Sequence, residues 1–237
     1  MNILRIARNF PSLDRIKYGI EPTVYYVSRE QVQMGLDVHI ICKGSPQEKK
    51  YEEIDGIKVH RVSSPFDLTM LHRLLRLSKE LQIDIIHSHA TSGFPYAIKR
   101  KIFGRRRHGH CNLVHIHGTT KGILQAWSKT PSNILNKEMI GRRIRICFSI
   151  MKENVTWKGA DALITNSQFL KKELPNIYAI PKERIHVVYN GVDLQVFYPR
   201  NSRNVILKNS SRQRKGSPDL IILQAWQAII LRMTVLL

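Results

Sequence analysis

The sequence predicts an α/β protein built on a doubly wound parallel sheet. Short apolar segments alternate along the chain with longer segments in which apolar residues recur at helical spacing, and this order of strands and helices is typical of that fold. The first apolar segment, residues 3–7, begins directly behind the N-terminus. With 237 residues the chain can form one domain and part of a second.

The opening of the chain has the pattern strand, loop, helix, strand. Residues 3–7 are the expected first strand, residues 23–34 the helix that Gly35 ends, and residues 37–42 the second strand. The loop before the helix contains Gly19, and backbone amides at the start of a helix can hold a phosphate there. A single glycine is not the Gly-x-Gly-x-x-Gly pattern of dinucleotide-binding loops, so the loop leaves phosphate contact open.

Strands and helices continue to alternate up to about residue 199. The expected elements are a hairpin turning at Asp55-Gly56, a helix over 68–81, a strand over 83–87, a helix over 90–103 interrupted near Pro95, a strand over 113–116, a helical segment over 132–158, a strand over 160–165, a helix from the cap Asn166-Ser167 to 174, and a strand over 185–188. Helices between successive strands favour parallel pairing, with helices on both faces of the sheet.

His117 and Gly118 stand where the strand over 113–116 ends. In an open parallel sheet, ligands bind outside the carboxyl ends of the strands, and a glycine there lets the backbone turn close to a ligand. His117 is therefore placed either to reach into a cleft or merely to cap the strand. The local pattern alone leaves both interpretations open.

The chain is strongly basic, with 38 lysines and arginines against 18 acidic residues and a net charge of +20. Such a surface attracts phosphate, whether in nucleic acid, anionic lipid or nucleotide. The sequence has no helix-turn-helix, RNP or zinc-finger signature, so we do not expect nucleic acid as a partner. A solvated basic surface and peripheral contact with an anionic membrane remain the two explanations.

The cysteines indicate a reducing compartment. Cys42, Cys111 and Cys147 are odd in number and far apart, which does not resemble a disulfide framework. The first strand begins by Asn2 and leaves no room for a signal peptide. We therefore expect a cytoplasmic location, and peripheral contact at the inner face of the membrane stays open as one of the two explanations of the basic charge.

Six histidines gather in the middle of the sequence and raise the question of zinc: His87, His89, His108, His110, His115 and His117. Two of the pairs are spaced two apart, which puts each pair on one face of a strand. Zinc needs three or four convergent ligands, and this spacing matches no standard zinc pattern. We therefore expect no metal site.

Taken together, the segments resemble the N-terminal half of glycosyltransferases of the GT-B fold, family 4. The segments that carry the resemblance are Tyr18-Gly19-Ile20-Glu21, residues 53–62 (Glu-Ile-Asp-Gly-Ile-Lys-Val-His-Arg-Val), residues 84–89 (Asp-Ile-Ile-His-Ser-His), residues 115–119 (His-Ile-His-Gly-Thr), residues 159–167 (Gly-Ala-Asp-Ala-Leu-Ile-Thr-Asn-Ser) and residues 187–193 (Val-Val-Tyr-Asn-Gly-Val-Asp), followed by Phe197 and Pro199. Their order and spacing over residues 1–199 are more specific than any one of them.

The resemblance implies a Rossmann-like first domain that mainly holds the acceptor, facing a second domain that holds a nucleotide-diphosphate sugar. It implies His117 as the catalytic residue beside the transferred sugar, with Gly19, Gly118 and Lys215 on the donor side. On the acceptor side it implies His87, His89 and Thr119, and the acceptor would be a glycan or a lipid-linked molecule. Transfer would retain the anomeric configuration and would require no metal or other cofactor.

The chain departs from the family pattern after residue 199. Residues 200–237 correspond to a truncated or divergent start of the donor domain: Lys215-Gly216 could be its Lys-Gly, but Asn209-Ser210 stand where Gly-Arg is expected, and no glutamate follows Glu183. We therefore expect a glycosyltransferase that is incomplete alone, with a separate polypeptide supplying the donor domain. The alternative is a non-catalytic acceptor- or membrane-binding remnant.

Overall fold

The computed structural model describes residues 1–10, 20–63, 68–104, 109–128 and 137–191. They contain an eight-stranded sheet in the order β3-β4-β2-β1-β5-β6-β7-β8. The strands are β1 (Asn2–Ile6), β2 (Asp37–Lys43), β3 (Tyr51–Ile54), β4 (Ile57–Val62), β5 (Ile85–His89), β6 (Cys111–Ile116), β7 (Ala162–Thr165) and β8 (Ile185–Val187). Only the edge strand β3 is antiparallel to its neighbour; the other pairs are parallel. The predicted parallel α/β fold is confirmed.

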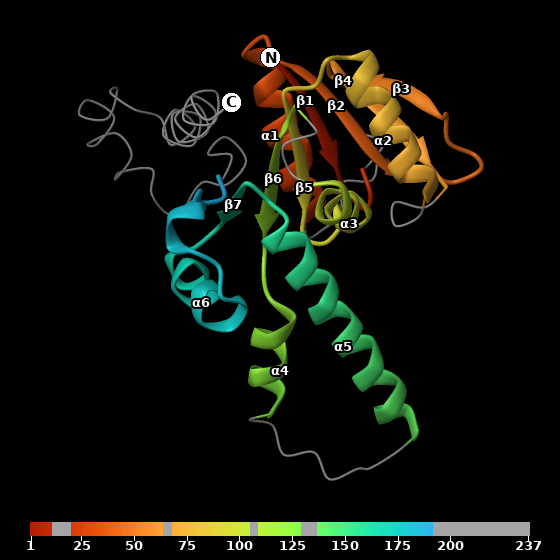
Figure 1. Cartoon of the computed structure of the whole chain (residues 1–237). Helices are drawn as coiled ribbons and strands as arrows, with labels where there is room; N and C mark the ends of the chain where they lie inside the picture. Colours follow the sequence, from red (N-terminus) through yellow and green to blue (C-terminus); the bar gives the residue numbers. More distant parts are fainter. Residues whose placement is uncertain (11–19, 64–67, 105–108, 129–136, 192–237) are drawn as a thin grey trace, which may run out of the picture.

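Helices cover both faces of the sheet, as Figure 1 shows. The described helices are α1 (Ile20–Gln33), α2 (Leu68–Glu80), α3 (Phe94–Phe103), α4 (Thr120–Ser128), α5 (Lys137–Lys158) and α6 (Gln168–Tyr178). Val24 and Tyr25 of α1 pack on β2 and β4 at one face. At the opposite face α2 and α3 pack on β1, β2 and β5, and α5 and α6 pack on β6 and β7. The two helical layers make the sheet doubly wound.

The strands read as nearly continuous apolar segments because both faces of the sheet are covered. All six residues of β6 are buried, and so are all five of β5. Both strands nevertheless contain histidines, and β1 contains Arg5, which has no exposed surface. These polar residues have to be accommodated inside the protein.

Several helices differ from the prediction, among them α1, which begins at Ile20 and not at residue 23. The helix expected over 90–103 begins at Phe94, so Pro95 lies in its first turn, where its missing N–H costs no hydrogen bond, and does not interrupt it. The helix capped by Ser167 was expected to end at 174, but α6 continues through Pro175 to Tyr178. Helix α4 was not predicted at all. The hydroxyl of Ser167 accepts a hydrogen bond from the backbone N–H of Leu170, so the predicted cap is present.

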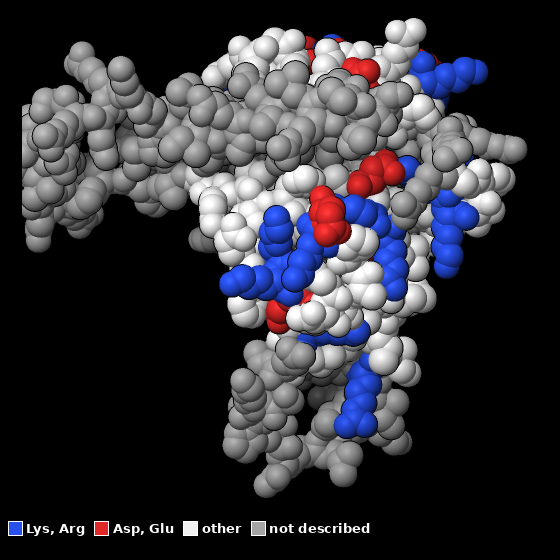
Figure 2. All heavy atoms as spheres, turned by 60° about the vertical axis from the view of Figure 1, so that its left-hand side comes forward, with Lys and Arg blue, Asp and Glu red and all other residues white. Residues whose placement is uncertain are grey.

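Helix α5 extends well beyond the sheet, with α4 beside it (Figure 1). Its outer part carries a row of exposed apolar and sulfur-containing side chains, which we call the α5 stripe: Ile144, Cys147, Phe148 and Met151. The described helices include none that combines the length and the apolar character needed to cross a membrane. Figure 2 shows the basic character of one face, where blue lysines and arginines outnumber red acidic residues.

Several predictions fall on residues outside the described ranges. They concern the loop containing Gly19, the Lys215-Gly216 pair, and the division of the chain into 1–199 and 200–237, all of which stay predictions. The three cysteines are described, and all are free: Cys42 and Cys111 are buried and Cys147 is exposed.

Candidate functional site

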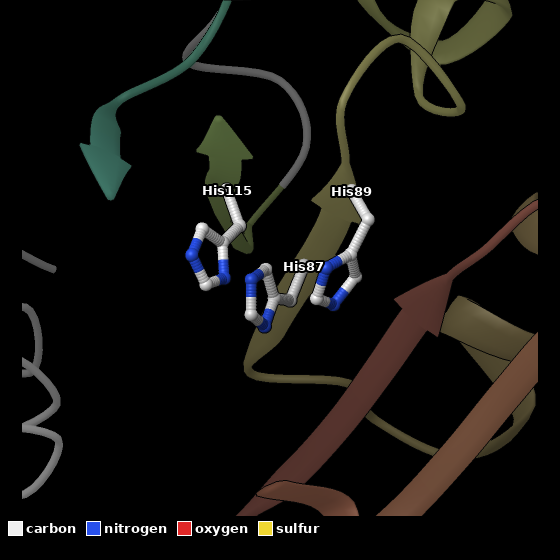
Figure 3. A group of neighbouring side chains, drawn as sticks. All are labelled: His87, His89 and His115. Atoms are coloured by element: carbon white, nitrogen blue, oxygen red, sulfur yellow. The ribbon is translucent and has the colours of Figure 1, made fainter. Parts of the chain in front are cut away.

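Four histidines from two neighbouring strands form one continuous group, which we call the histidine row: His87, His89, His115 and His117. His87 and His89 belong to β5, and His115 lies directly opposite His89 on β6. His117 follows β6 at the carboxyl edge of the sheet. Figure 3 shows how the rings of His87, His89 and His115 face one another across the two strands. The spacing of two in each pair puts all four side chains on the face covered by α1.

The rings of the row lie in stacked or tilted contact. The ring centroids are 4.6 Å apart for His87 and His89, 5.4 Å for His89 and His115, and 4.2 Å for His115 and His117. Nδ1 of His89 is 3.2 Å from Nε2 of His117, which is hydrogen-bond distance. Only His117 is half-buried, while the other three are buried. The row therefore leads from the interior of the sheet to its carboxyl edge.

Arg5 of β1 anchors the inner end of the row. Its Nη1 atom lies 2.9 Å from Nδ1 of His87 and 3.2 Å from Nε2 of His89, and Nη2 donates to Oε1 of Gln31 on α1. The prediction of an apolar strand over residues 3–7 does not include Arg5 as a site residue, nor does any predicted site include Gln31. The available signal was a single charge in the middle of a buried strand, because such a charge needs partners inside the protein.

Burial keeps these imidazoles neutral near neutral pH. It lowers the pKa of His87, His89 and His115 well below the ordinary value of histidine, and the charge of Arg5 adds to the effect at all three. Burial also lowers the pKa of His117 to about 4. The pKa of Arg5 falls to about 9 for the same reason, so the guanidinium remains charged at neutral pH. The site thus combines one buried cation with neutral rings.

The arrangement opposes a metal ion, although three ring nitrogens converge. One nitrogen from each of His87, His89 and His115 lies within 4.8 Å of the other two, and zinc would need such nitrogens as lone-pair donors. Nδ1 of His87 and Nε2 of His89 face the guanidinium of Arg5, which occupies those lone pairs and would repel a second cation. The expectation of no metal site stays a prediction, supported by this charge.

The turn after β6 is held by hydrogen bonds that the sequence did not reveal. The hydroxyl of Thr119 accepts from the backbone N–H of Gly122 and so caps α4. Glu153 of α5 accepts from the backbone N–H of Thr120 at 2.9 Å and from its hydroxyl at 2.5 Å, and also from the hydroxyl of Tyr178. Glu153 is a buried carboxylate, and it ties the start of α4 to α5 and α6.

Gly118 lies open between His117 and this cap. A Cβ atom built at Gly118 would meet no described atom within 4 Å, and the residue is exposed. The predicted residues His117, Gly118 and Thr119 therefore lie at one edge of the sheet, and His89 and His87 continue from His117 into its interior. The structure does not describe Gly19 and Lys215, so their position relative to this group stays a prediction.

A second feature lies at the carboxyl end of β4. It is an open pocket of about 480 Å³ lined by Lys50, Arg61, Val62, Ser63, Thr69, His72 and Arg73. Four of these side chains are basic or can become so, and none is acidic. Arg61 is paired with Glu52, which leaves Lys50 and Arg73 as the main source of positive charge. We call it the basic pocket.

Relatives with assigned names share low sequence identity with this chain. The D-inositol 3-phosphate glycosyltransferase of Nocardioides sp. is 25% identical over 219 residues, covering 85% of this chain and 43% of the relative. The alpha-maltose-1-phosphate synthase of Mycolicibacterium smegmatis is 24% identical over 202 residues, covering 84% and 46%. The chain thus spans less than half the length of these relatives.

Solved structures show the same fold. Sucrose-phosphate synthase from Thermosynechococcus elongatus superposes with a TM-score of 0.58 at 14% identity, over 84% of this chain and 50% of that one. The Anabaena protein HepE, solved in complex with UDP and glucose, gives a TM-score of 0.51 at 14% identity, over 89% and 50%. The sequence model of Glycosyltransferase Family 4 matches residues 18–196. Since this match covers more than half of the sequence, the chain belongs to glycosyltransferase family 4.

Proposed function

We propose that the chain takes part in transfer of a sugar from a nucleotide-diphosphate sugar to a glycan or lipid-linked acceptor, with retention of the anomeric configuration. The observation that carries this proposal is the placement of His117 and Gly118 at the carboxyl edge of a parallel sheet, where open α/β folds bind ligands. Family membership supports the reaction class, and a relative in the same fold was solved with UDP and glucose.

His117 is the proposed catalytic residue, and Gly118 the place where the backbone approaches the donor. His87 and His89 are only 1% and 3% exposed. As acceptor-side residues they therefore act indirectly, through His117, to which His89 is hydrogen-bonded. Thr119 would shape the acceptor side through its cap on α4. Gly19 and Lys215 are the proposed donor-side residues. A separate polypeptide that supplies donor-domain residues is a further proposed partner.

The basic pocket supports an acceptor that carries a phosphate group. Lys50 and Arg73 place positive charge at the carboxyl end of β4, on the same edge of the sheet as His117, and hydroxyls of Ser63 and Thr69 line the same space. Lysine and arginine are the residues that commonly hold phosphate oxygens. Lipid-linked acceptors with a phosphate headgroup and free sugar phosphates share this chemistry.

The test is transfer of radiolabelled sugar from a panel of nucleotide-sugars, with the purified full chain and membrane extract. We expect His117→Ala to lower turnover about 100-fold or more, the range for loss of one group that stabilises developing charge. His186→Ala, which changes a histidine of β8 outside the histidine row, is the matched control and should leave turnover unchanged. Absence of turnover with every donor, from folded protein, would contradict the proposal.

A second candidate function is binding to an anionic membrane, and the α5 stripe favours it. Ile144, Phe148 and Met151 are 64%, 49% and 42% exposed, at helical spacings that put them on one side of α5. Arg143 and Arg145 are exposed beside them. An apolar stripe flanked by cations suits the boundary between anionic headgroups and acyl chains.

Vesicle co-sedimentation tests this second candidate. We expect the chain to bind vesicles that contain anionic lipid, and a Phe148→Ser/Met151→Ser variant to bind them about tenfold less. Ile102 and Phe103 of α3 are also exposed, so Ile102→Ser/Phe103→Ser removes as many apolar side chains elsewhere and should bind as the original chain does. Equal binding by all three proteins would contradict a role for the α5 stripe.

A further inference from the structure

A continuous set of hydrogen bonds joins Arg5, in the centre of the sheet, to His117 at its carboxyl edge. Nη1 of Arg5 lies 3.2 Å from Nε2 of His89, and Nδ1 of His89 lies 3.2 Å from Nε2 of His117. The same Nη1 atom lies 2.9 Å from Nδ1 of His87. Both ring nitrogens of His89 therefore have a partner, with a guanidinium at one and an imidazole at the other.

The chemistry of the guanidinium decides the direction of these bonds. Arginine has five N–H donors and no acceptor, so Nε2 of His89 can only accept from Arg5. Arg5 itself is held in place, because Nη2 donates to Gln31 of α1 and the residue has no exposed surface. The position of the donor is thus fixed by two elements, β1 and α1.

The imidazoles of His89 and His117 each carry one N–H proton, on either Nδ1 or Nε2. Burial holds the pKa of His89 well below its ordinary value and that of His117 at about 4, so both are neutral near pH 7. A neutral imidazole has one donor nitrogen and one acceptor nitrogen. Since Nε2 of His89 accepts, its proton lies on Nδ1 and is donated to Nε2 of His117. His117 must therefore carry its own proton on Nδ1.

We propose that Arg5 is a positioning residue that fixes the tautomer of His117 through His89, so that His117 offers an N–H donor at Nδ1 to an oxygen of the sugar substrate. The identity of that oxygen rests on the proposed function, whereas the tautomer is a property of the free chain. A neutral histidine in water favours the proton on Nε2, so the relay reverses the ordinary preference.

This tautomer determines what His117 can do. With Nε2 occupied by His89, the nitrogen left for a ligand is a donor and cannot act as a general base. A fixed N–H donor stabilises an oxygen that gains negative charge as the bond between sugar and diphosphate breaks, and the hydrogen bond needs no reorientation at that moment. The half-buried position of His117 at the sheet edge allows such contact.

The test is the tautomer of His117 in the folded full chain, measured from nitrogen chemical shifts and long-range ¹H–¹⁵N couplings in protein labelled with ¹⁵N-histidine. His117→Gln assigns the signals by their loss. We expect Nδ1–H in the original chain and a shift to Nε2–H, or to a mixture, in Arg5→Met. Arg5→Lys keeps a donor-only group and should restore Nδ1–H. The matched control His60→Phe changes a buried histidine on the opposite face of the sheet and should leave His117 unchanged.

Two results would overturn the proposal: Nε2–H on His117 in the original chain, or unchanged Nδ1–H in folded Arg5→Met. The first needs no variant, so a failure of Arg5→Met to fold leaves the proposal testable. His89→Phe interrupts the relay at its middle while Arg5 stays in place. In this variant too, the proton of His117 should shift to Nε2 or to a mixture of both nitrogens.

Kinetics separate this proposal from the proposed function. Where the original chain transfers sugar, Arg5→Met should lower kcat about 10- to 100-fold, by analogy with the loss of an outer hydrogen-bond partner of a metal-binding histidine. KM for the acceptor should change little, and Arg5→Lys should recover part of the rate. If His117 carries its proton on Nδ1 but the chain transfers no sugar, the relay is upheld and the proposed function is contradicted. If the chain transfers sugar but His117 carries its proton on Nε2, the proposed function is upheld and the relay is contradicted.

Discussion

At the scale of single residues, the buried charge of Arg5 is stabilised by neutral acceptors from α1 and β5. A buried charge without partners costs several kcal/mol, and here Gln31, His87 and His89 accept hydrogen bonds from the guanidinium. The two imidazoles can accept only while they are neutral. The charge of Arg5 in turn lowers their pKa. The cation and the neutral rings therefore stabilise each other.

The buried histidines predict that the fold loses stability as the pH falls from about 6.5 to about 4. In the unfolded chain a histidine takes up its proton near pH 6.5, whereas the folded-state pKa is about 4 for His60 and for His117. Between these values the unfolded state binds more protons, so acid favours it. Each such histidine lowers the free energy of unfolding by up to about 1.4 kcal/mol per pH unit. Urea unfolding at pH values between 7 and 4 measures the effect.

His60→Phe provides the comparison for this prediction. The variant lacks one titrating group, so its free energy of unfolding should fall with a smaller slope over the same pH range. Burial is the main cause of the low pKa of His60, with the neighbouring charges of His39 and Arg73 adding to it. The pKa of Asp37 is lowered, so this carboxylate also destabilises the fold in acid, but mainly at the lower end of the range and below it, and equally in both proteins. Stability that stayed constant from pH 6.5 to 4 would refute the prediction.

At the scale of elements, the turn between β3 and β4 depends on a glycine for two reasons. Gly56 has a φ of +76°, and a Cβ atom there would lie 2.6 Å from Cγ1 of Val32 on α1. We expect Gly56→Ala to lower the free energy of unfolding by about 1–2 kcal/mol for the left-handed backbone, and by about a further 1–3 kcal/mol for the steric overlap.

Gly35, at the end of α1, separates the two effects. Its φ is +79°, but a Cβ atom there would meet nothing within 4 Å. Gly35→Ala should therefore show only the backbone cost of about 1–2 kcal/mol. The difference between the two variants in urea unfolding measures the contact between the turn and α1. Equal losses would mean that Val32 moves away without cost.

Most elements could be predicted because their sequence patterns are local. Buried parallel strands appear as apolar segments, and Asp55-Gly56 and Ser167 mark a turn and a helix start by their own chemistry. Helix α4 was missed, since its start depends on Thr119 and on Glu153 from a distant helix. Sheet order is equally non-local, because the chain returns to pair β5 with β1 after building the β2–β4 edge.

The candidate site was predictable only at its outer end. His117 and Gly118 could be placed at a strand end from the sequence, and His87 and His89 from the resemblance. Arg5 could not be assigned, because its partners come from α1 and β5 and meet only when β1 lies beside β5. The register that sets His89 opposite His115 is likewise a property of the folded sheet.

At the scale of the whole molecule, the features proposed for ligands lie toward the carboxyl edge of the sheet. The histidine row ends there, the basic pocket lies at the end of β4, and α5 extends beyond the same edge with α4 (Figure 1). This arrangement combines an edge for small polar ligands with an exposed helix whose stripe is apolar.

The two contributions to membrane binding should respond differently to salt. Charge attraction between the basic chain and anionic vesicles is screened as the Debye length falls from about 10 Å at 0.1 M salt to about 3 Å at 1 M, whereas apolar contact through the α5 stripe is not screened. We expect binding to fall over this range but not to vanish. In Phe148→Ser/Met151→Ser the part that remains at about 1 M should be strongly reduced, because those side chains are 49% and 42% exposed in the original chain. Binding that did not change with salt, or that was equal on neutral vesicles, would show that charge does not bring the chain to the membrane.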